Sequence, residues 1–176
     1  MAAARLHPPE KLSDDAEQLI KILQQGSDFT VVIVGLSYLD ACLTALLSRH
    51  FLASATADEL LDPNRGPLGS LATKAKLAYA LGLIYKPFLH DILLLAELRN
   101  TVAHSHLELS FEDPAIKVLC GRLSILTEVK HPGTDEPLLR PEMNRTPREH
   151  FILSCVIIWG HILAIAKETT HVTVRA

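Results

Sequence analysis

The residues with the clearest chemical potential in this sequence are Arg99, Asn100 and His104, which stand in an otherwise apolar segment. Asn100 and His104 are four residues apart, so they would be neighbours on one face of a helix. The apolar residues before them recur at steps of four and three, as on one face of a helix. Because Arg99 continues this series, we expect its guanidinium on the apolar face. These apolar residues are Phe88, Ile92 and Leu95. An arginine placed there must be paired, hydrogen-bonded or exposed at a groove or a subunit seam.

This trio has the groups needed for metal-independent RNA cleavage. A histidine whose pKa is near neutrality can transfer protons, and an arginine can stabilise the negative charge of a phosphorane when a 2′-hydroxyl attacks. Two copies that met at a seam would supply an acid, a base and an anion clamp. The alternative is an internal hydrogen-bond network that only fixes how helices pack. The residues leave both interpretations open.

A metal site is not expected in this sequence, and neither is a cofactor. His104 and His106 lack a third ligand at helical spacing. The segment Arg65-Gly66-Pro67-Leu68-Gly69-Ser70 precedes a predicted helix and could present backbone N–H groups to an anion. It matches neither the P-loop nor the dinucleotide fingerprint. A tight connection between helices is the favoured interpretation of this segment.

The elements that must position these residues are predicted to be helices throughout. Proline-rich or glycine-rich loops separate them, at 62–70 and around 130–145. Thr146-Pro147-Arg148-Glu149 combines a capping box with proline at the first helical position, which is the clearest helix start in the chain. The expected helices are 13–26, 28–51 with Asp28 as its cap, 57–61, 71–84 capped by Ser70, 87–104, 114–129 and 147–167. We therefore expect an all-α fold: one helical-bundle domain of about seven helices over residues 1–176, with flexible ends at 1–12 and 170–176.

Composition narrows the class of protein. Hydrophobic residues make up 48% of the 176 residues and charged residues 21%, which indicates a packed globular protein. The formal charge of −3 provides no general attraction to nucleic acid, and no basic recognition helix is evident, so specific reading of duplex DNA is not expected. The apolar run 29–47 contains Asp40, which favours a core helix over a membrane span. Three widely spaced cysteines without a secretory leader predict reduced thiols in the cytoplasm.

Three segments in order resemble the mannitol operon repressor family. They are Gly66-Pro67-Leu68-Gly69, the stretch Ala78-Tyr79-Ala80-Leu81-Gly82-Leu83-Ile84, and Leu98-Arg99-Asn100 with Ala103-His104-Ser105. The resemblance covers roughly residues 28–165. The family pattern has an arginine shortly after the first segment, where Lys74 or Lys76 is the nearest basic residue here. We therefore group Lys74 and Lys76 with Arg65, Gly66 and Ser70 as candidate binding residues.

The resemblance implies an all-α, oligomeric, cytoplasmic protein that takes part in repressing a sugar-alcohol operon. Because no DNA-reading motif accompanies it, such a repressor is expected to act through a protein partner or through RNA, and to form a homodimer. A regulatory role without enzymatic activity is the favoured interpretation.

A second, local resemblance supports the alternative function. Arg99, Asn100 and His104 are similar to the Arg-x4-His signature of HEPN-type helical ribonucleases and toxins, whose site forms at a dimer seam. This resemblance covers one helix only. It implies a metal-independent endoribonuclease, or an RNA-binding derivative of one, with these three residues as its catalytic set.

Overall fold

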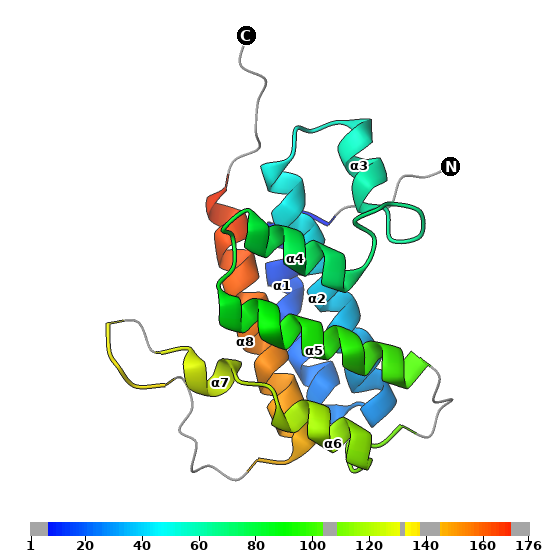
Figure 1. Cartoon of the computed structure of the whole chain (residues 1–176), viewed down its shortest axis with the longest axis vertical. Helices are drawn as coiled ribbons and strands as arrows, with labels where there is room; N and C mark the ends of the chain where they lie inside the picture. The colour runs from blue at the N-terminus through cyan, green and yellow to red at the C-terminus, as the bar shows by residue number, and fades with distance from the viewer. Residues whose placement is uncertain (1–6, 104–108, 131–132, 138–144, 170–176) are drawn as a thin grey trace.

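The computed structural model describes residues 7–103, 109–130, 133–137 and 145–169, and these residues fold as helices joined by loops (Figure 1). The helices are α1 (Pro9–Gln25), α2 (Asp28–His50), α3 (Ala55–Leu61), α4 (Leu71–Ala80), α5 (Lys86–Ala103), α6 (Pro114–Gly121), α7 (Ile125–Glu128) and α8 (Pro147–Glu168). Because α7 is a single turn, the prediction of an all-α fold of about seven helices is confirmed.

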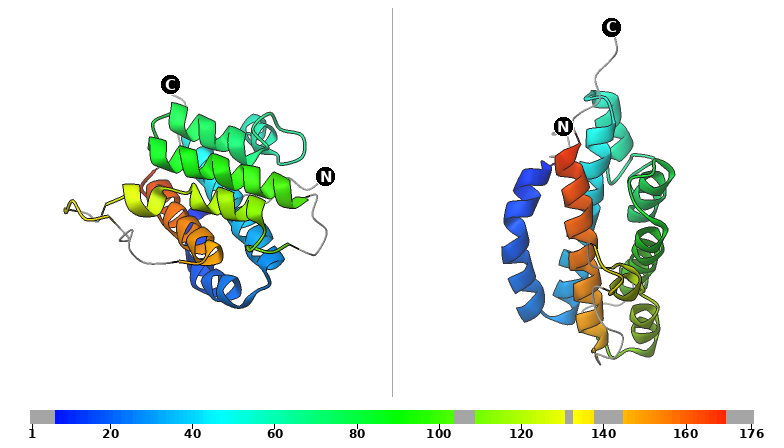
Figure 2. Two further views of the ribbon diagram at one scale, coloured as in Figure 1. Left: turned by 60° about the horizontal axis from the view of Figure 1, so that its bottom comes forward. Right: turned by 90° about the vertical axis from the view of Figure 1, so that its left-hand side faces the viewer.

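The helices form two layers around a single core. α1, α2 and α8 run side by side along the long axis, and α4, α5 and α6 cover one side of them (Figures 1 and 2). α2 packs most extensively against α8 and also contacts α1, α3, α4 and α5. The interior is aliphatic with few aromatic rings, so its burial supplies most of the drive to fold.

Two helices have the length and apolar composition of a membrane span, α2 and α8. Their most apolar windows have a mean hydropathy of 1.9 and 1.7, and 56% and 44% of those windows is buried inside the fold. They are the central pair of the bundle, and mutual burial accounts for their composition, as predicted for residues 29–47.

The first helix begins earlier than predicted. α1 starts at Pro9, four residues before the expected Ser13, and Leu12 is buried in the core. The Tyr38 hydroxyl donates a hydrogen bond to the Leu12 carbonyl, which fastens this end of α1 to α2. Residues 9–12 of the stretch expected to be flexible are helical, while the flexibility of this end stays a prediction, and residues 1–6 and 170–176 lie outside the described part of the chain.

The helix predicted over 114–129 is interrupted, and a buried carboxylate explains the break. Asp91 of α5 is fully buried and accepts hydrogen bonds from the backbone N–H groups of Ser124, at 3.0 Å, and Ile125, at 2.8 Å. These N–H groups would otherwise bond within a continuous helix. The chain therefore ends α6 at Gly121 and starts α7 at Ile125.

Local hydrogen bonds determine where α2 and α8 begin. The predicted cap of α2 is wrong by one residue, and the predicted start of α8 is confirmed. Ser27, not Asp28, caps α2, because its hydroxyl accepts from the Thr30 N–H. The capping box of Thr146 and Glu149 at the start of α8 is confirmed in both directions. The backbone N–H groups of Thr146 and Glu149 are therefore both bonded to side-chain oxygens at this helix start.

α4 ends at Ala80 instead of continuing to residue 84. Gly82 has φ +72°, a left-handed conformation that favours glycine, its N–H donates to the Tyr79 carbonyl, and the Leu83 N–H donates to the Ala78 carbonyl. This pair of bonds is a Schellman motif, which closes a helix C-terminus. The chain therefore turns sharply between α4 and α5.

Candidate functional site

The glycine-rich loop 62–70 satisfies its own backbone. The Asp62 side chain accepts the N–H groups of Asn64 and Arg65, both at 2.9 Å, and the Asp62 carbonyl accepts that of Gly66. The Gly69 N–H in turn donates to the Gly66 carbonyl. A Cβ atom on Gly66 would lie 2.4 Å from the Leu60 carbonyl oxygen, so glycine is required there for close packing. The loop behaves as the tight connection that its sequence favoured.

The candidate binding residues in this loop have structural positions. Ser70 caps α4 through its hydroxyl, which accepts from the Thr73 N–H at 3.1 Å. The N–H groups of Arg65 and Gly66 are engaged within the loop, and the Arg65 side chain is exposed. An anion could therefore not be held by the N–H groups of Arg65 and Gly66, and the binding role of these residues stays a prediction.

Lys74 is buried in an ion pair, whereas Lys76 is exposed. The Lys74 ammonium lies 2.7 Å from Oδ2 of Asp40, and the two side chains are 1% and 19% exposed. The pair joins α4 to the middle of α2. Asp40 is the only acidic residue of α2 beyond its first turn, and Lys74 neutralises its charge. Oδ1 of Asp40 is also buried and accepts no hydrogen bond from the described residues. Lys74 is therefore a buried structural residue, whereas the side chain of Lys76 faces solvent.

Arg99 and Asn100 are both exposed on α5. The buried row of this helix continues from Leu95 to Leu98, so the prediction that Arg99 occupies the apolar face is wrong. The reason is the helical period, because a step of three from Leu95 places Leu98 inward and turns Arg99 about 100° further round. His104 lies outside the described residues, so the predicted trio is present here only as two solvent-facing side chains.

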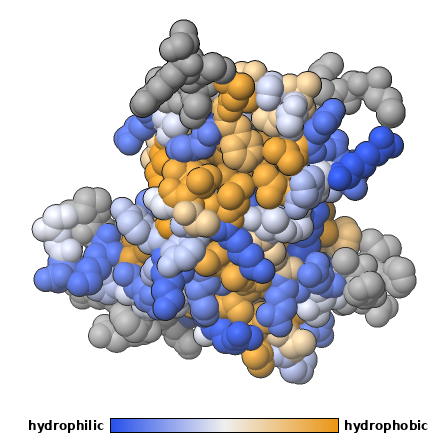
Figure 3. All heavy atoms as spheres, turned by 45° about the horizontal axis from the view of Figure 1, so that its top comes forward, coloured by the Kyte–Doolittle hydropathy of each residue, from blue (hydrophilic) through white to orange (hydrophobic). Residues whose placement is uncertain are grey.

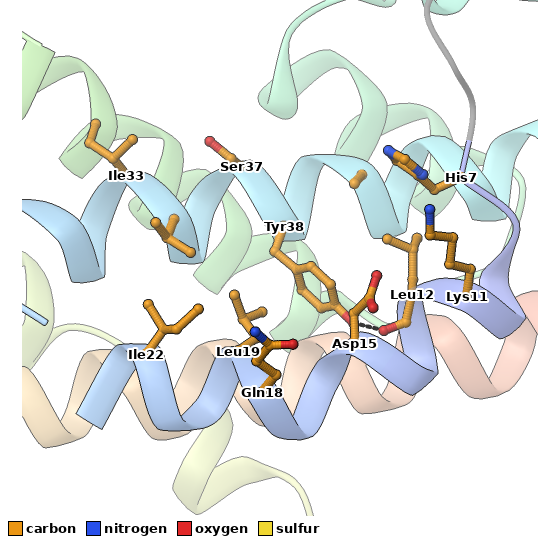
Figure 4. A pocket seen from close by; sticks show the side chains of 12 residues that line it. His7, Lys11, Leu12, Asp15, Gln18, Leu19, Ile22, Ile33, Ser37 and Tyr38 are labelled. Carbon is orange, nitrogen blue, oxygen red and sulfur yellow. Dashed lines mark hydrogen bonds between the residues drawn. The ribbon is translucent and has the colours of Figure 1, made fainter. Parts of the chain in front are cut away.

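An open apolar groove runs between α1 and α2, and the sequence reasoning missed it (Figure 4). Its volume is about 440 Å³. Leu19 and Ile22 of α1 face Ile33 and Tyr38 of α2 across it. Further lining side chains are polar: His7, Lys11, Asp15, Gln18 and Ser37. The amphipathic pattern of α1 and the apolar composition of α2 are visible in the sequence, but the gap between the two helices depends on how they pack.

Three large hydrophobic side chains near the junction of α4 and α5 are exposed. Tyr79, Leu81 and Tyr85 are 43%, 49% and 68% exposed, although most large apolar side chains of this fold are buried. Behind them His161 of α8 stacks on Phe88, with ring centroids 4.1 Å apart, and lies 5.8 Å from the Tyr85 ring. Figure 3, a view with the top of Figure 1 brought forward, shows that strongly apolar side chains, a class to which tyrosine does not belong on this hydropathy scale, form one area of this side of the molecule with polar residues around it.

The described residues offer no metal centre and no activated thiol. No three His, Cys, Asp or Glu side chains gather among them as metal ligands would. Burial raises the pKa of the Cys42 and Cys155 thiols well above the ordinary range and that of Cys120 to about 12. Because the thiolate is the reactive form, these cysteines are packing residues.

The described surface therefore displays an apolar groove and several exposed hydrophobic side chains. A family model described as mannitol repressor, MtlR, matches residues 14–165. The X-ray structure of the MtlR–HPr complex from Escherichia coli contains a chain of similar fold, with a TM-score of 0.61 and 25% sequence identity, and the match covers 83% of this chain and 96% of that one. Among curated proteins, none matches. The chain belongs to the MtlR mannitol repressor family, as its three motifs predicted.

Proposed function

We propose that this protein represses a sugar-alcohol operon by binding a protein partner of the HPr type, without reading DNA itself. The observation that carries the proposal is the similarity to a chain whose solved structure is a complex with HPr, because the similarity extends over 96% of that chain. The exposed hydrophobic side chains on an otherwise well-packed fold also support a protein partner.

The distribution of cations supports a protein partner over duplex DNA. Several basic side chains in the described helices are already paired: Arg49 with Glu10, Lys74 with Asp40, Lys117 with Glu112 and Arg148 with Asp28. Specific DNA binding needs a stripe of unpaired cations on an element that fits a groove. The formal charge of −3 also provides no general attraction to the phosphate backbone of DNA.

Isothermal titration of the full chain with purified HPr from the same organism tests this proposal. We expect saturable binding at physiological salt and no sequence-selective shift of operator duplex in a parallel gel assay. Two results would contradict the proposal: titration without heat or saturation at high micromolar HPr, or a salt-resistant, sequence-selective shift of the operator at nanomolar protein.

We also propose that the protein is a cytoplasmic homodimer. Three buried cysteines without a disulfide support a reducing compartment. The open, partly apolar groove between α1 and α2 supports self-association as a surface that a second copy of the chain would cover. Light scattering coupled to size exclusion should give twice the chain mass, and a concentration-independent monomer would rule the dimer out.

RNA remains the alternative partner of this proposal. Affinity capture from the native cell, with and without nuclease treatment, separates the two classes. A co-purifying protein that survives nuclease treatment supports a protein partner. Loss of every partner after nuclease treatment would support RNA.

A further inference from the structure

The inference concerns how two copies of the chain meet, so it rests on the homodimer proposed above. We propose that the seam of this dimer is the outer face of α8, where the helices of the two copies pack antiparallel about a two-fold axis at the level of Ile158. The α8 face is defined by the side chains that would meet across this axis: Glu149, Ile152, Val156, Gly160, Ala164 and Lys167. Its occupant is the same face of a second copy.

One side of α8 is apolar although the fold leaves it uncovered. The most apolar 18-residue window of this helix has a mean hydropathy of 1.7, and 44% of it is buried. Ile152 and Val156 are half-buried, and Gly160 and Ala164 are exposed. These four residues recur at steps of four and so form one row along the helix. Figure 2, in its right-hand view, shows α8 on the outside of the bundle beside α1.

Gly160 has no explanation within the chain. A Cβ atom at this position would meet no atom of the described residues within 4 Å, so internal packing does not require glycine there. Glycine inside a helix is unfavourable relative to alanine, but it allows another backbone to approach closely. Ala164, one turn further on, is also small and exposed. Both residues therefore fit the close approach of a second helix.

A groove of about 330 Å³ borders the α8 face, between α8 and α1. Ser13, Ala16 and Ile20 line it from α1, and Trp159 lines it from α8. Trp159 is 2% exposed, and its indole nitrogen donates to no acceptor among the described residues. Because a buried indole N–H ordinarily has a partner, we expect a polar group of the second copy to accept from it when that copy covers the groove.

The sizes of the side chains specify where the two helices cross. Val156 and Gly160 are each two residues from Ile158, so in an antiparallel pair every Val156 would lie opposite Gly160 of the other copy. Ile152 and Ala164 are each six residues from Ile158 and would pair in the same way. Large side chains opposite small ones fill the space between two helices without a clash.

The charges at the two ends of the α8 face specify the antiparallel direction. Glu149 and Lys167 are both exposed and are each nine residues from Ile158, so every Glu149 would lie opposite Lys167 of the other copy. About five helical turns separate the two residues, which places them on the same side of α8. A parallel pair would bring Glu149 against Glu149 and Lys167 against Lys167, and like charges oppose that arrangement.

Sedimentation equilibrium of the full chain measures the dissociation constant of the dimer. Gly160→Leu places a side chain where the second helix would approach, so we expect that constant to rise about tenfold or more. The matched control is Gly121→Leu at the end of α6, because a Cβ atom there also meets no atom of the described residues within 4 Å. The control should dimerise within about twofold of wild type, and circular dichroism should show that both variants are folded.

A charge swap tests the antiparallel register. Lys167→Glu places like charges at both ends of the seam and should weaken the dimer about tenfold, and Glu149→Lys should do the same. The double variant restores opposite charges and should return to within about threefold of wild type. Because Glu149 also caps α8, this recovery separates the contact between copies from an effect on the cap. A double variant that stays as weak as the single variants would overturn the register.

Trp159 reports on the seam directly, because it is the only tryptophan of the chain. Dilution through the dissociation constant should shift its fluorescence emission as water enters the groove beside it. The shift should be absent in Gly160→Leu at concentrations where that variant is already monomeric. Emission that stays constant while the measured mass halves would place the seam elsewhere and overturn the inference.

The outcomes separate the seam from the dimer itself. A wild type that is monomeric at every concentration ends both the homodimer and the inference. If wild type and Gly160→Leu dimerise equally well, the homodimer stands and the inference fails. Ile22→Arg probes the α1–α2 groove, which Ile22 lines. Loss of the dimer in this variant, with Gly160→Leu unaffected, would move the seam to that groove and overturn the inference.

Discussion

The guanidinium of Arg148, in the first turn of α8, binds the carboxylate of Asp28 in the first turn of α2, with Nη1 2.5 Å from Oδ1. The same guanidinium donates through Nη2 to the carbonyls of Leu23 and Gly26, at 3.0 and 2.6 Å, where α1 ends. Oδ2 of Asp28 accepts the Phe111 N–H, just before α6. One charged pair therefore ties the ends of four helices together at the bottom of the bundle in Figure 1.

Arg148→Ala should destabilise the fold by about 2 kcal/mol. The substitution leaves the α1 carbonyls and the Asp28 carboxylate without their charged donor, and hydrogen bonds to charged groups contribute about 1.5–3 kcal/mol each, reduced here because both side chains remain 26% exposed. Urea unfolding followed by circular dichroism measures the change. Arg148→Lys keeps the charge but loses the planar fork, so it should fall between wild type and alanine. Equal stability of all three proteins would contradict the role of this pair.

The Lys74–Asp40 pair should behave as a buried ion pair. Lys74→Met leaves the Asp40 carboxylate without its partner and should cost about 3 kcal/mol, the lower end of the range for broken buried pairs, because part of Asp40 reaches solvent. The double variant with Asp40→Leu should recover most of the loss, since no charge is then left unpaired. A double variant as unstable as the single one would show that volume, not charge, is the cause.

Asp91→Ala should weaken the junction between α5 and α7. Two backbone N–H groups, of Ser124 and Ile125, lose their acceptor, and we expect a loss of about 2–4 kcal/mol. The matched control is His90→Ala, because the half-exposed His90 ring also contacts Asp91, at 3.0 Å, but caps no helix. Hydrogen exchange would locate the effect: the amides of α7 should lose protection in the Asp91 variant and keep it in the His90 variant.

Stability should fall as the solution becomes acidic, partly through His161. Burial lowers the pKa of His161 below its ordinary value of 6.5, so below that pH the unfolded chain binds more protons than the folded one. The contribution of the neutral ring is therefore complete above pH 6.5 and is lost as the pH falls through the lowered folded-state pKa. His150 has a pKa lowered by the same cause and should add to the effect.

His161→Phe keeps a ring against Phe88 and removes the titration. We expect the slope of the unfolding free energy between pH 6.5 and 5 to be smaller in this variant than in wild type, as measured by urea unfolding at several pH values. An identical slope would show that His161 does not contribute to the acid sensitivity.

In a ribonuclease that uses Arg99, this side chain would be needed for RNA cleavage but not for folding. Because this side chain is exposed, Arg99→Ala should leave stability within about 0.5 kcal/mol of wild type. A structured RNA incubated with wild type should remain intact in a gel assay with chelator present. Cleavage that disappears in both Arg99→Ala and His104→Ala, with folding intact, would establish the nuclease and contradict a purely regulatory role.

The sequence by itself determined the helical class, several helix starts and the family. The caps at Ser70 and at Thr146 with Glu149 were readable because a capping side chain bonds to a backbone group three residues away. The α2 core helix was readable from its length and apolar content. These signals are local, so no knowledge of the rest of the fold was needed to interpret them.

Tertiary structure decided which polar side chains are buried and which large hydrophobic side chains are exposed. Lys74 is inside because Asp40, 34 residues earlier, lies opposite it, and residues 114–129 form two helices because Asp91 reaches across from α5. Arg99 is outside because Leu98 takes the inward position. The exposure of Tyr79, Leu81 and Tyr85 likewise depends on how α4 and α5 pack on the central helices. Apart from Arg99, whose position follows from the period of α5 itself, each outcome results from contacts between different helices, which spacing along a single helix cannot specify.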